Sequence, residues 1–358
     1  MKKLFLLLSI LSVFVFACNK EDEPEPGPPQ ASKVFYISNE GAYGYGNASV
    51  TLFYPEENSV QNDAFMKANN RHPGDVLQSV YQANNKMYLL VNASNKIEIA
   101  APKTLKELGV ITNIKMPRYM VSRDDKTAYV SSWGGGSKGQ IQLIDIVNDK
   151  VISTINVGNG PEKMLINSRA DDRLIVCNSG GFSNDSTLSI IDTRTKQLIA
   201  TTKVADNPID LVLETNGFWV LCKGKVIYDA NFNITGHTPS YLLHLNDNGQ
   251  IVNNSAKLFE EQHPGHMAID PGRKYIYVGG GFGFKGIYRF DITTNTLDTI
   301  PLIDKEFYGF NVDMETGDLY CFEAPSFTAS GKMHLYNKEG KLLKSFTVGI
   351  GPNGIFME

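Results

Sequence analysis

Cysteine is scarce in this chain, with four in 358 residues. Cys18 lies near the N-terminus, whereas Cys177, Cys222 and Cys321 each fall within or just after a strand-like segment. These three later cysteines are odd in number and lack C-x-x-C spacing, which argues against a disulfide framework and against a cysteine metal site. We therefore expect the three later thiols to be buried as small apolar side chains.

The chain also lacks a strong excess of charge, because its formal net charge is only −4. A nucleic-acid-binding protein needs a basic face, so nucleic acid is not an expected partner. The sequence contains no H-E-x-x-H zinc motif and no phosphate-binding loop. We therefore expect neither catalytic residues, nor a catalytic cofactor, nor a bound metal.

A run of apolar residues long enough to span a bilayer is missing at the N-terminus. Lys2 and Lys3 precede the apolar segment 4–16, and Ala17-Cys18 follows it. This pattern predicts a signal peptide over residues 1–17. The junction resembles the bacterial lipoprotein signal, which implies lipidation of Cys18 and anchoring to a membrane through lipid only. Ordinary secretory cleavage beside a chance cysteine is the alternative.

Residues 18–32 are rich in acid and proline and contain no apolar anchors. Such a composition predicts an extended tether. The acidic run after the cysteine resembles the export signal of Bacteroidetes lipoproteins, which implies a location on the outer face of the outer membrane. A merely solvated spacer is the alternative.

Prolines recur along the rest of the chain at a nearly fixed spacing. They are Pro73, Pro117, Pro161, Pro208, Pro264 and Pro352. The first two intervals are 44 residues, and the last one, 88 residues, has Tyr308 at its midpoint. A period in the forties with strand-like content is typical of a β-propeller.

The segment 119–157 shows the repeated unit as four alternating, β-branched strands separated by turn residues. Seven such units cover residues 33–358 and resemble the YVTN type of surface propeller repeat. The first unit lacks an innermost strand, and the last has one to spare at Gly354–Glu358. Pairing this segment with Lys33–Ser38 predicts a closed, all-β, seven-bladed propeller.

In such blades, the crossover loops and the loops after the second strand lie on the same face. Several of these loops place aromatic residues among glycines: Tyr43, Tyr45, Trp133, Phe182, Phe282, Phe284 and Phe327. The long fifth loop adds Tyr228, Phe232 and His237. Aromatic rings gathered on one rim predict an amphipathic binding surface. The alternative is that each ring packs over its own blade.

The crossover loops add polar residues to this face, among them Arg71, Arg118 and Glu162. We expect the residue that follows each regularly spaced proline to lie near the mouth of the central channel. Arg118 and Glu162 lie on adjacent blades, so an ion pair between them is as probable as a contact with a ligand. His72 and His263 occupy equivalent His-Pro-Gly tripeptides and are expected to face each other across the ring. That separation is too large for shared metal ligation.

The first hundred residues carry more specific motifs. They are Asn39-Glu40-Gly41, Phe65 with Asn69, Gly74-Asp75 with Gln78-Ser79, Val91-Asn92 with Ser94 and Lys96-Ile97-Glu98, and Pro117-Arg118-Tyr119. This set resembles a Bacteroidetes lipoprotein propeller family that includes surface proteins capturing cobalamin (vitamin B12) for a TonB-dependent outer-membrane transporter. The later blades match only as generic repeats.

The resemblance implies a corrinoid ligand and a transporter partner. On this interpretation the rim aromatics, with His237 and Tyr308, supply contact area, while Arg71, Asn92, Arg118 and Glu162 orient the ligand. A scaffold that binds a protein or glycan is the main alternative, and a metal-dependent lactonase or other hydrolase is a further one.

Overall fold

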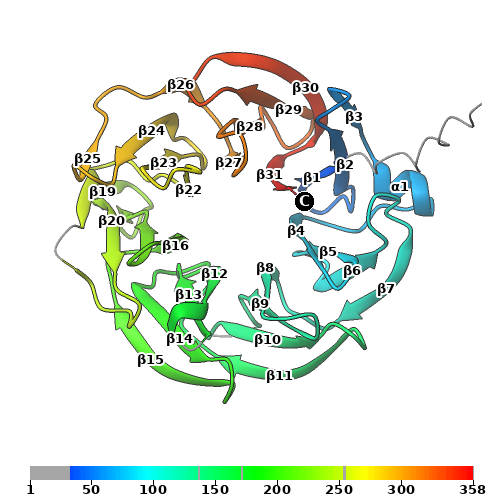
Figure 1. Ribbon diagram of the computed structural model, residues 1–358, viewed down its shortest axis with the longest axis horizontal. Coiled ribbons are helices and arrows are strands. Elements are labelled where there is room, and N and C mark those ends of the chain that lie inside the picture. The colour runs from blue at the N-terminus through cyan, green and yellow to red at the C-terminus, as the bar shows by residue number, and fades with distance from the viewer. Residues whose placement is uncertain (1–32, 136–137, 171, 253–254, 358) are drawn as a thin grey trace, which may run out of the picture. The chain divides into compact units, whose positions relative to one another are not determined.

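The computed structural model describes residues 33–135, 138–170, 172–252 and 255–357, which form seven antiparallel sheets around a central axis (Figure 1). The prediction of an all-β, seven-bladed propeller is confirmed. The segments 1–17 and 18–32, including Cys18, lie outside the described residues. Within the described part of the chain, no helix is long and apolar enough to cross a membrane.

Each blade has an inner strand near the axis and successive strands that run outward. The strands of the first three blades are β31 (Pro352–Met357), β1 (Phe35–Asn39), β2 (Ser49–Tyr54) and β3 (Ser59–Gln61); β4 (Leu77–Ala83), β5 (Lys86–Val91), β6 (Lys96–Ala100) and β7 (Glu107–Thr112); and β8 (Pro117–Ser122), β9 (Thr127–Ser132), β10 (Gln140–Asp145) and β11 (Lys150–Asn156). The helix α1 (Ala64–Asn69) follows β3 and was not predicted.

Blades four to seven continue the same order. Their strands are β12 (Pro161–Asn167), β13 (Arg173–Asn178), β14 (Thr187–Asp192) and β15 (Gln197–Lys203); β16 (Pro208–Glu214), β17 (Gly217–Cys222), β20 (Ser240–Leu245) and β21 (Ala256–Phe259); β22 (His266–Ile269), β23 (Tyr275–Gly279), β24 (Lys285–Asp291), β25 (Thr296–Leu297) and β26 (Ile303–Glu306); and β27 (Gly309–Val312), β28 (Leu319–Glu323), β29 (Ser330–Tyr336) and β30 (Leu342–Ile350). A 3-10 turn, η1 (Ser168–Ala170), links β12 and β13.

The ring closes as predicted. Strand β31 pairs antiparallel with β1, so that Phe35 lies opposite Met357 and Asn39 lies opposite Pro352. The C-terminal strand therefore supplies the inner strand of the first blade, which leaves that inner edge paired.

Four of the marker prolines, at positions 117, 161, 208 and 352, are the first residues of inner strands. A fixed φ and a missing N–H donor suit a bend immediately before a strand. Apolar clusters fill the spaces between the sheets, and the largest contains the fully buried Trp219. The three cysteines of the propeller are buried and free, as predicted.

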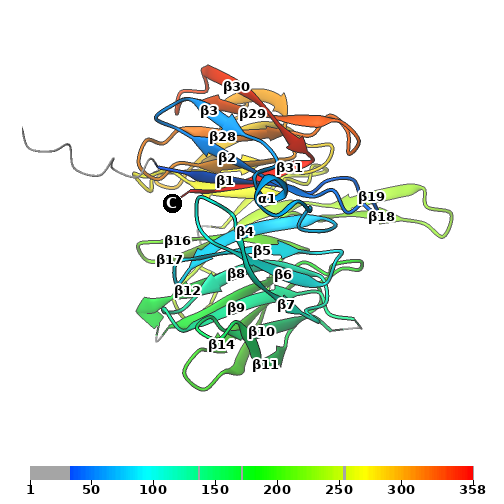
Figure 2. The same ribbon diagram turned by 90° about the vertical axis from the view of Figure 1, so that its right-hand side faces the viewer.

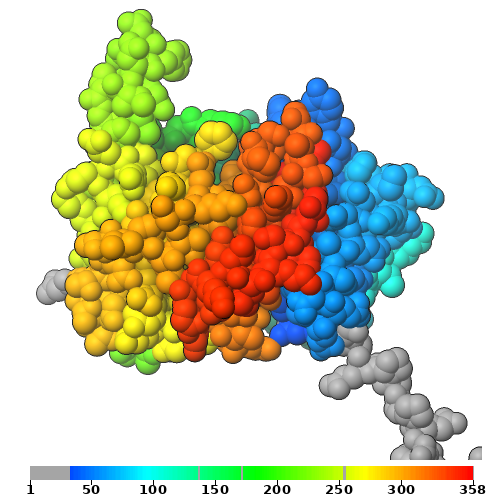
Figure 3. All heavy atoms as spheres, turned by 90° about the horizontal axis from the view of Figure 1, so that it is seen from above, coloured from blue at the N-terminus to red at the C-terminus, as the bar shows by residue number. Residues whose placement is uncertain are grey.

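The long fifth loop differs from expectation, because it contains a hairpin of its own. Strands β18 (Lys225–Tyr228) and β19 (Ile234–Thr238) pair antiparallel and belong to no blade. Figures 2 and 3 show this hairpin projecting from the ring of blades. Four of its apolar side chains are exposed, namely Ile227, Tyr228, Phe232 and Ile234.

Candidate functional site

An axial cavity of about 660 Å³ opens among the inner strands, and residues from all seven blades line it. Its lining includes residues of the crossover loops and of the loops after the second strands. Backbone hydrogen bonds join these two loop types directly, as from Trp133 N–H to the Met116 carbonyl (3.2 Å) and from Lys223 N–H to the Asn207 carbonyl (3.1 Å). The prediction that they share one face is therefore confirmed.

The residues that follow the prolines line this cavity in five of six cases. They are Arg118, Glu162, Ile209, Gly265 and Asn353. Gly74 is the exception. Its φ is +144°, and a Cβ there would lie 2.6 Å from the Ser94 hydroxyl, so the chain passes too close to blade two for a side chain.

Arg118 and Glu162 form the ion pair that the sequence left open, with Nε and Oε2 3.0 Å apart and Glu162 almost fully buried. Glu162 also accepts hydrogen bonds from the Trp133 indole (3.2 Å) and the Ser179 hydroxyl (3.4 Å). The guanidinium donates to Gln78 and lies 4.4 Å from the centre of the Trp133 ring. Burial opposes the charge of Arg118, but the Glu162 carboxylate outweighs it and raises the pKa of the guanidinium.

A second buried pair lies beside the first. Lys163 Nζ is 2.5 Å from the buried Asp210 carboxylate, which also accepts from the backbone N–H groups of Leu211 and Met267. Burial opposes the charge of Lys163, and Asp210 more than compensates by raising its pKa. Both carboxylates on this side of the cavity are therefore already bonded by protein groups.

Glu40 approaches the cavity from the first blade. It accepts hydrogen bonds from the Tyr308 hydroxyl (3.1 Å) and the Asn353 amide (3.0 Å). Burial raises the pKa of this carboxyl despite these donors and the charge of Arg118.

Histidines and a lysine form the part of the cavity wall that blades five and six contribute. His263 Nδ1 lies 2.7 Å from the Lys223 carbonyl, and its Nε2 lies 2.9 Å from His237 Nδ1. His237 thus joins the projecting hairpin to the cavity wall. Burial and the nearby charges of Lys163, Lys223 and Arg118 lower the pKa of His266 to about 3, so its imidazole is neutral.

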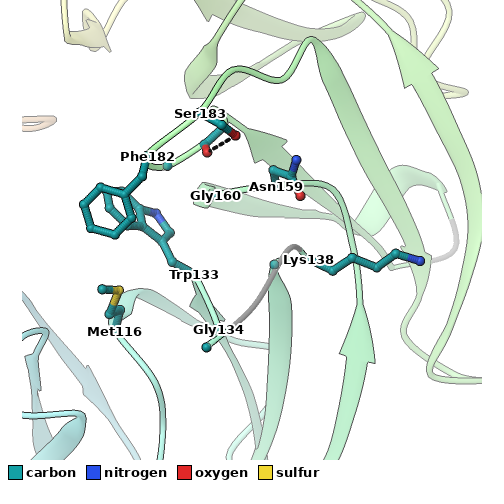
Figure 4. Close-up of a pocket in the computed structure, with 12 residues that line it drawn as sticks. Met116, Trp133, Gly134, Lys138, Asn159, Gly160, Phe182 and Ser183 are labelled. Carbon is teal, nitrogen blue, oxygen red and sulfur yellow. Dashed lines mark hydrogen bonds between the residues drawn. The ribbon is translucent and has the colours of Figure 1, made fainter.

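A groove of about 570 Å³ between blades three and four shares Trp133 with the axial cavity (Figure 4). Phe182 packs edge-on against Trp133, with ring centres 5.0 Å apart, and keeps 85% of its surface exposed. Glycine is required beneath these rings. Gly160 has φ +55°, and a Cβ there would lie 1.9 Å from the Gly181 nitrogen.

The other predicted aromatic residues differ in exposure and position. Tyr43, Tyr45 and Phe282 are about four-fifths exposed, and the loop of the two tyrosines is held to blade two by a hydrogen bond from Gly44 N–H to Asp75 (2.8 Å). Phe282 and Tyr308 line the axial cavity. Phe327 is half-buried and packs edge-on against Tyr308 at 5.4 Å.

Phe284 requires a correction, because it is buried (3% exposed) rather than displayed on the rim. It packs between Phe259 and Tyr288, with centroid distances of 5.3 and 6.0 Å. The alternative that a loop ring covers its own blade applies to this residue.

Three polar residues that were predicted on this face do not line the axial cavity. Arg71 is bound to Glu98 and Glu107 at 2.8 and 2.9 Å, and the Asn92 amide donates to the Pro117 carbonyl. Neither lines the axial cavity, and neither does His72, whose ring contacts the Ala48 carbonyl. Of the two histidines expected to face each other across the ring, only His263 lines the cavity, and it is bonded to His237.

Sequence reasoning did not select four charged or titratable residues that line the cavity: Glu40, Lys163, Lys223 and His266. The sequence contained a pattern that could have identified two of them, because Lys163 and His266 each lie two residues after one of the regularly spaced prolines. Glu40 was in the quoted Asn-Glu-Gly motif. Lys223 follows β17 in a loop without any distinguishing pattern.

The fold and this site define a closed seven-bladed propeller with an axial cavity and an aromatic-rimmed loop face. The family model called domain of unknown function (DUF5074) matches residues 33–350, and the chain belongs to this family. No curated protein matches the sequence.

Solved structures share the fold at low identity. A quinonprotein alcohol dehydrogenase-like protein of Bacteroides thetaiotaomicron is 16% identical, with a TM-score of 0.63 over 91% of this chain and 78% of that one. A putative 6-phosphogluconolactonase of Bacteroides fragilis is 14% identical, with a TM-score of 0.65 over 93% of this chain and 100% of that one. Hydrazine synthase of Kuenenia stuttgartiensis is 14% identical, with a TM-score of 0.62 over 78% and 88%. These likenesses concern the fold alone.

Proposed function

We propose that this protein is a cell-surface lipoprotein of the outer membrane that binds a corrinoid on its loop face and passes it to a TonB-dependent transporter. In this proposal the protein binds its ligand without catalysing a reaction. The observation that carries the proposal is the set of exposed aromatic rings around the axial cavity, with Trp133 shared between the cavity and the adjacent groove.

The energetics favour a ligand on this surface. Phe182 and Phe282 each leave 85% of their surface in water, and covering a phenylalanine side chain contributes roughly 2 kcal/mol. A corrinoid is wide and flat, with an apolar body and a fringe of amides, so it suits a surface of rings set among polar groups. The closed ring holds Trp133 through the Glu162 hydrogen bond, and a preorganised site loses less entropy on binding.

Calorimetry with cyanocobalamin tests the proposal. We expect saturable heat with the purified protein at micromolar concentration, and at least about tenfold weaker binding in Trp133→Ala, because about 1.4 kcal/mol corresponds to a factor of ten. Phe232→Ala is the control, since it removes an exposed aromatic ring that lies on the projecting hairpin and does not line the cavity. Absence of heat in the native protein, or equal losses in both variants, would contradict corrinoid binding on the rim.

The projecting hairpin favours a second role, contact with a partner protein. Its exposed residues Tyr228, Phe232 and Ile234 form an apolar tip on a two-stranded element that packs into no blade. We assign the transporter contact to this tip. A scaffold that binds another protein or a glycan without a corrinoid is the competing interpretation, and it predicts no heat with cyanocobalamin.

Delivery and anchoring have separate tests. Phe232→Asp is expected to leave cyanocobalamin binding unchanged but to slow corrinoid uptake by cells that express the protein. Cys18→Ser is expected to release the protein from the outer-membrane fraction. Unchanged uptake would remove the hairpin from the transporter contact, and unchanged fractionation would remove the lipid anchor.

A further inference from the structure

Three cationic side chains line the axial cavity, and they differ in their partners. Arg118 is paired with Glu162 at 3.0 Å, and Lys163 with Asp210 at 2.5 Å. The ammonium of Lys223 has no hydrogen bond or ion pair with any residue in the described ranges of the chain. Lys223 is therefore the cation of this wall whose charge the protein leaves uncompensated.

The backbone holds Lys223 in place from both sides. Its N–H donates to the Asn207 carbonyl at 3.1 Å, and its carbonyl lies 2.7 Å from His263 Nδ1. These contacts tie the loop after β17 to the crossovers that precede blades five and six. The backbone of Lys223 is therefore held in place before a ligand binds, which reduces the conformational entropy lost on binding.

The nearby carboxylates are already engaged. Glu162 interacts electrostatically with Lys223, but its oxygens accept hydrogen bonds from Arg118, Trp133 and Ser179. Glu40 belongs to the first blade, three blades away from Lys223 by the shorter way round the ring, and is bonded by Tyr308 and Asn353. Burial lowers the pKa of Lys223, as expected for an ammonium without a close counterion.

A neutral donor lies close to this ammonium. His266 lines the same cavity and is near enough for the charge of Lys223 to affect it. A neutral imidazole carries one N–H, which an oxyanion accepts. The exposed ring of Phe282, from blade six, and the indole of Trp133, from blade three, also line this cavity, so an anion that enters it meets apolar surface as well as the charge.

We propose that the axial cavity is an oxyanion site in which Lys223 binds a carboxylate or phosphate and His266 donates a second hydrogen bond. The proposal does not depend on the corrinoid assignment, because it rests on the cavity wall rather than on the rim as a whole. The anion is either a free ion or the charged end of a ligand whose apolar part contacts Trp133 and Phe282.

Two probes of equal shape separate charge from apolar contact. Binding of 2-naphthoate is compared with binding of the neutral 2-naphthamide by calorimetry, using the native protein and Lys223→Met. A charge-assisted hydrogen bond predicts a preference of about tenfold or more for naphthoate in the native protein. This preference is expected to disappear in Lys223→Met, whose thermal stability should not fall, because the substitution removes an uncompensated charge.

Lys150→Met is the matched control, since it removes the same charge from the exposed start of β11. It is expected to keep the full naphthoate preference. Equal affinities of the two probes in the native protein, or a preference that survives in Lys223→Met, would overturn the proposal.

Acetate and inorganic phosphate distinguish the two sources of the anion. If either binds as tightly as naphthoate and is lost in Lys223→Met, the site takes free ions. If only naphthoate binds, the site takes the anionic end of a larger ligand. Both outcomes support the oxyanion site. Failure of cyanocobalamin to bind while naphthoate does would overturn only the corrinoid proposal.

Discussion

At the scale of single residues, the axial cavity brings buried charges together at short distances. Arg118, Glu162, Lys163 and Asp210 form two adjacent pairs, and further hydrogen bonds satisfy both carboxylates. Removing one member of a buried pair leaves the other without compensation, which is more costly than the pair is stabilising. The residues that shape the site are therefore also residues on which stability depends.

Glu162→Gln tests this dependence. The amide keeps the shape of Glu162 and an acceptor for the Trp133 indole, but it leaves Arg118 without its counterion. We expect the free energy of unfolding to fall by about 3–5 kcal/mol, measured by urea denaturation. Glu56→Gln on the exposed surface serves as the control and should change it little. A loss no larger than that of the control would show that the pair is not energetically significant.

Glu40 gives a prediction that depends on pH. Burial raises the pKa of its carboxyl in the folded protein above the ordinary 4.5, so the ionised form costs folding free energy above that raised pKa and the cost disappears below 4.5. Glu40→Gln never carries this charge. We expect the variant to be more stable than the native protein at pH 8 and to lose this advantage by pH 4, as measured by urea denaturation at both values. An advantage that does not change with pH would contradict the assignment.

At the scale of elements, the β18–β19 hairpin is a two-stranded sheet that lies outside the blades. Two-stranded hairpins are marginally stable by themselves, so its contacts with the ring determine how firmly it is held. His237 is one such contact. Because His263 Nδ1 faces the Lys223 carbonyl, which only accepts, its Nε2 must accept from His237 Nδ1.

A proton on His263 Nε2 would place two N–H groups opposite each other and break this link. Burial lowers the pKa of His263 in the folded protein, whereas a released imidazole binds its proton near 6.5. Release of the hairpin is therefore favoured increasingly as pH falls below about 6.5. A dye attached to Asn231→Cys, in a Cys18→Ser background, reports on how firmly the hairpin is held. We expect its fluorescence anisotropy to decrease as the pH is lowered below about 6.5.

His237→Phe keeps a ring at the same position but cannot donate, so its anisotropy should not respond to pH in this range. The native cysteines of the propeller are buried and should not take up the dye. The same pH response in both proteins would show that the histidine link does not hold the hairpin.

At the scale of the whole molecule, closure of the ring makes the first blade depend on both ends of the propeller sequence. Ile355 of β31 packs with Phe35, Ile37 and Phe53 in an apolar cluster and is only 8% exposed. An inner strand that joins residues more than 300 positions apart couples the last blade to the first. Loss of this contact should therefore affect the ring as a unit.

Ile355→Ala is expected to lower the free energy of unfolding by about 2–4 kcal/mol, because it leaves a cavity in a packed cluster. We expect one cooperative transition in urea, observed equally by fluorescence and circular dichroism. Met314→Ala, at a half-exposed position, should have little effect. Two separate transitions in Ile355→Ala would indicate that the closing blade unfolds independently.

Much of this architecture follows from the sequence itself. The proline period and the alternation of apolar residues predicted seven blades, and the surplus strand at residues 354–358 predicted closure. The loop types also predicted which loops share one face. These features are local or repeated along the chain, so a single sequence contains them directly.

The contacts of individual side chains required the tertiary structure. Phe282 and Phe284 are two residues apart in one glycine-rich loop, yet the first is exposed and the second is buried between Phe259 of blade five and Tyr288 of blade six. Residues of blades one, four, five and six meet in the axial cavity, and sequence spacing does not encode their distances. The sequence thus determined the ring and its face, because both arise from a repeated local pattern. Only the folded ring decided which charges are paired and that Lys223 is not, because that depends on side chains from distant blades meeting at the axis.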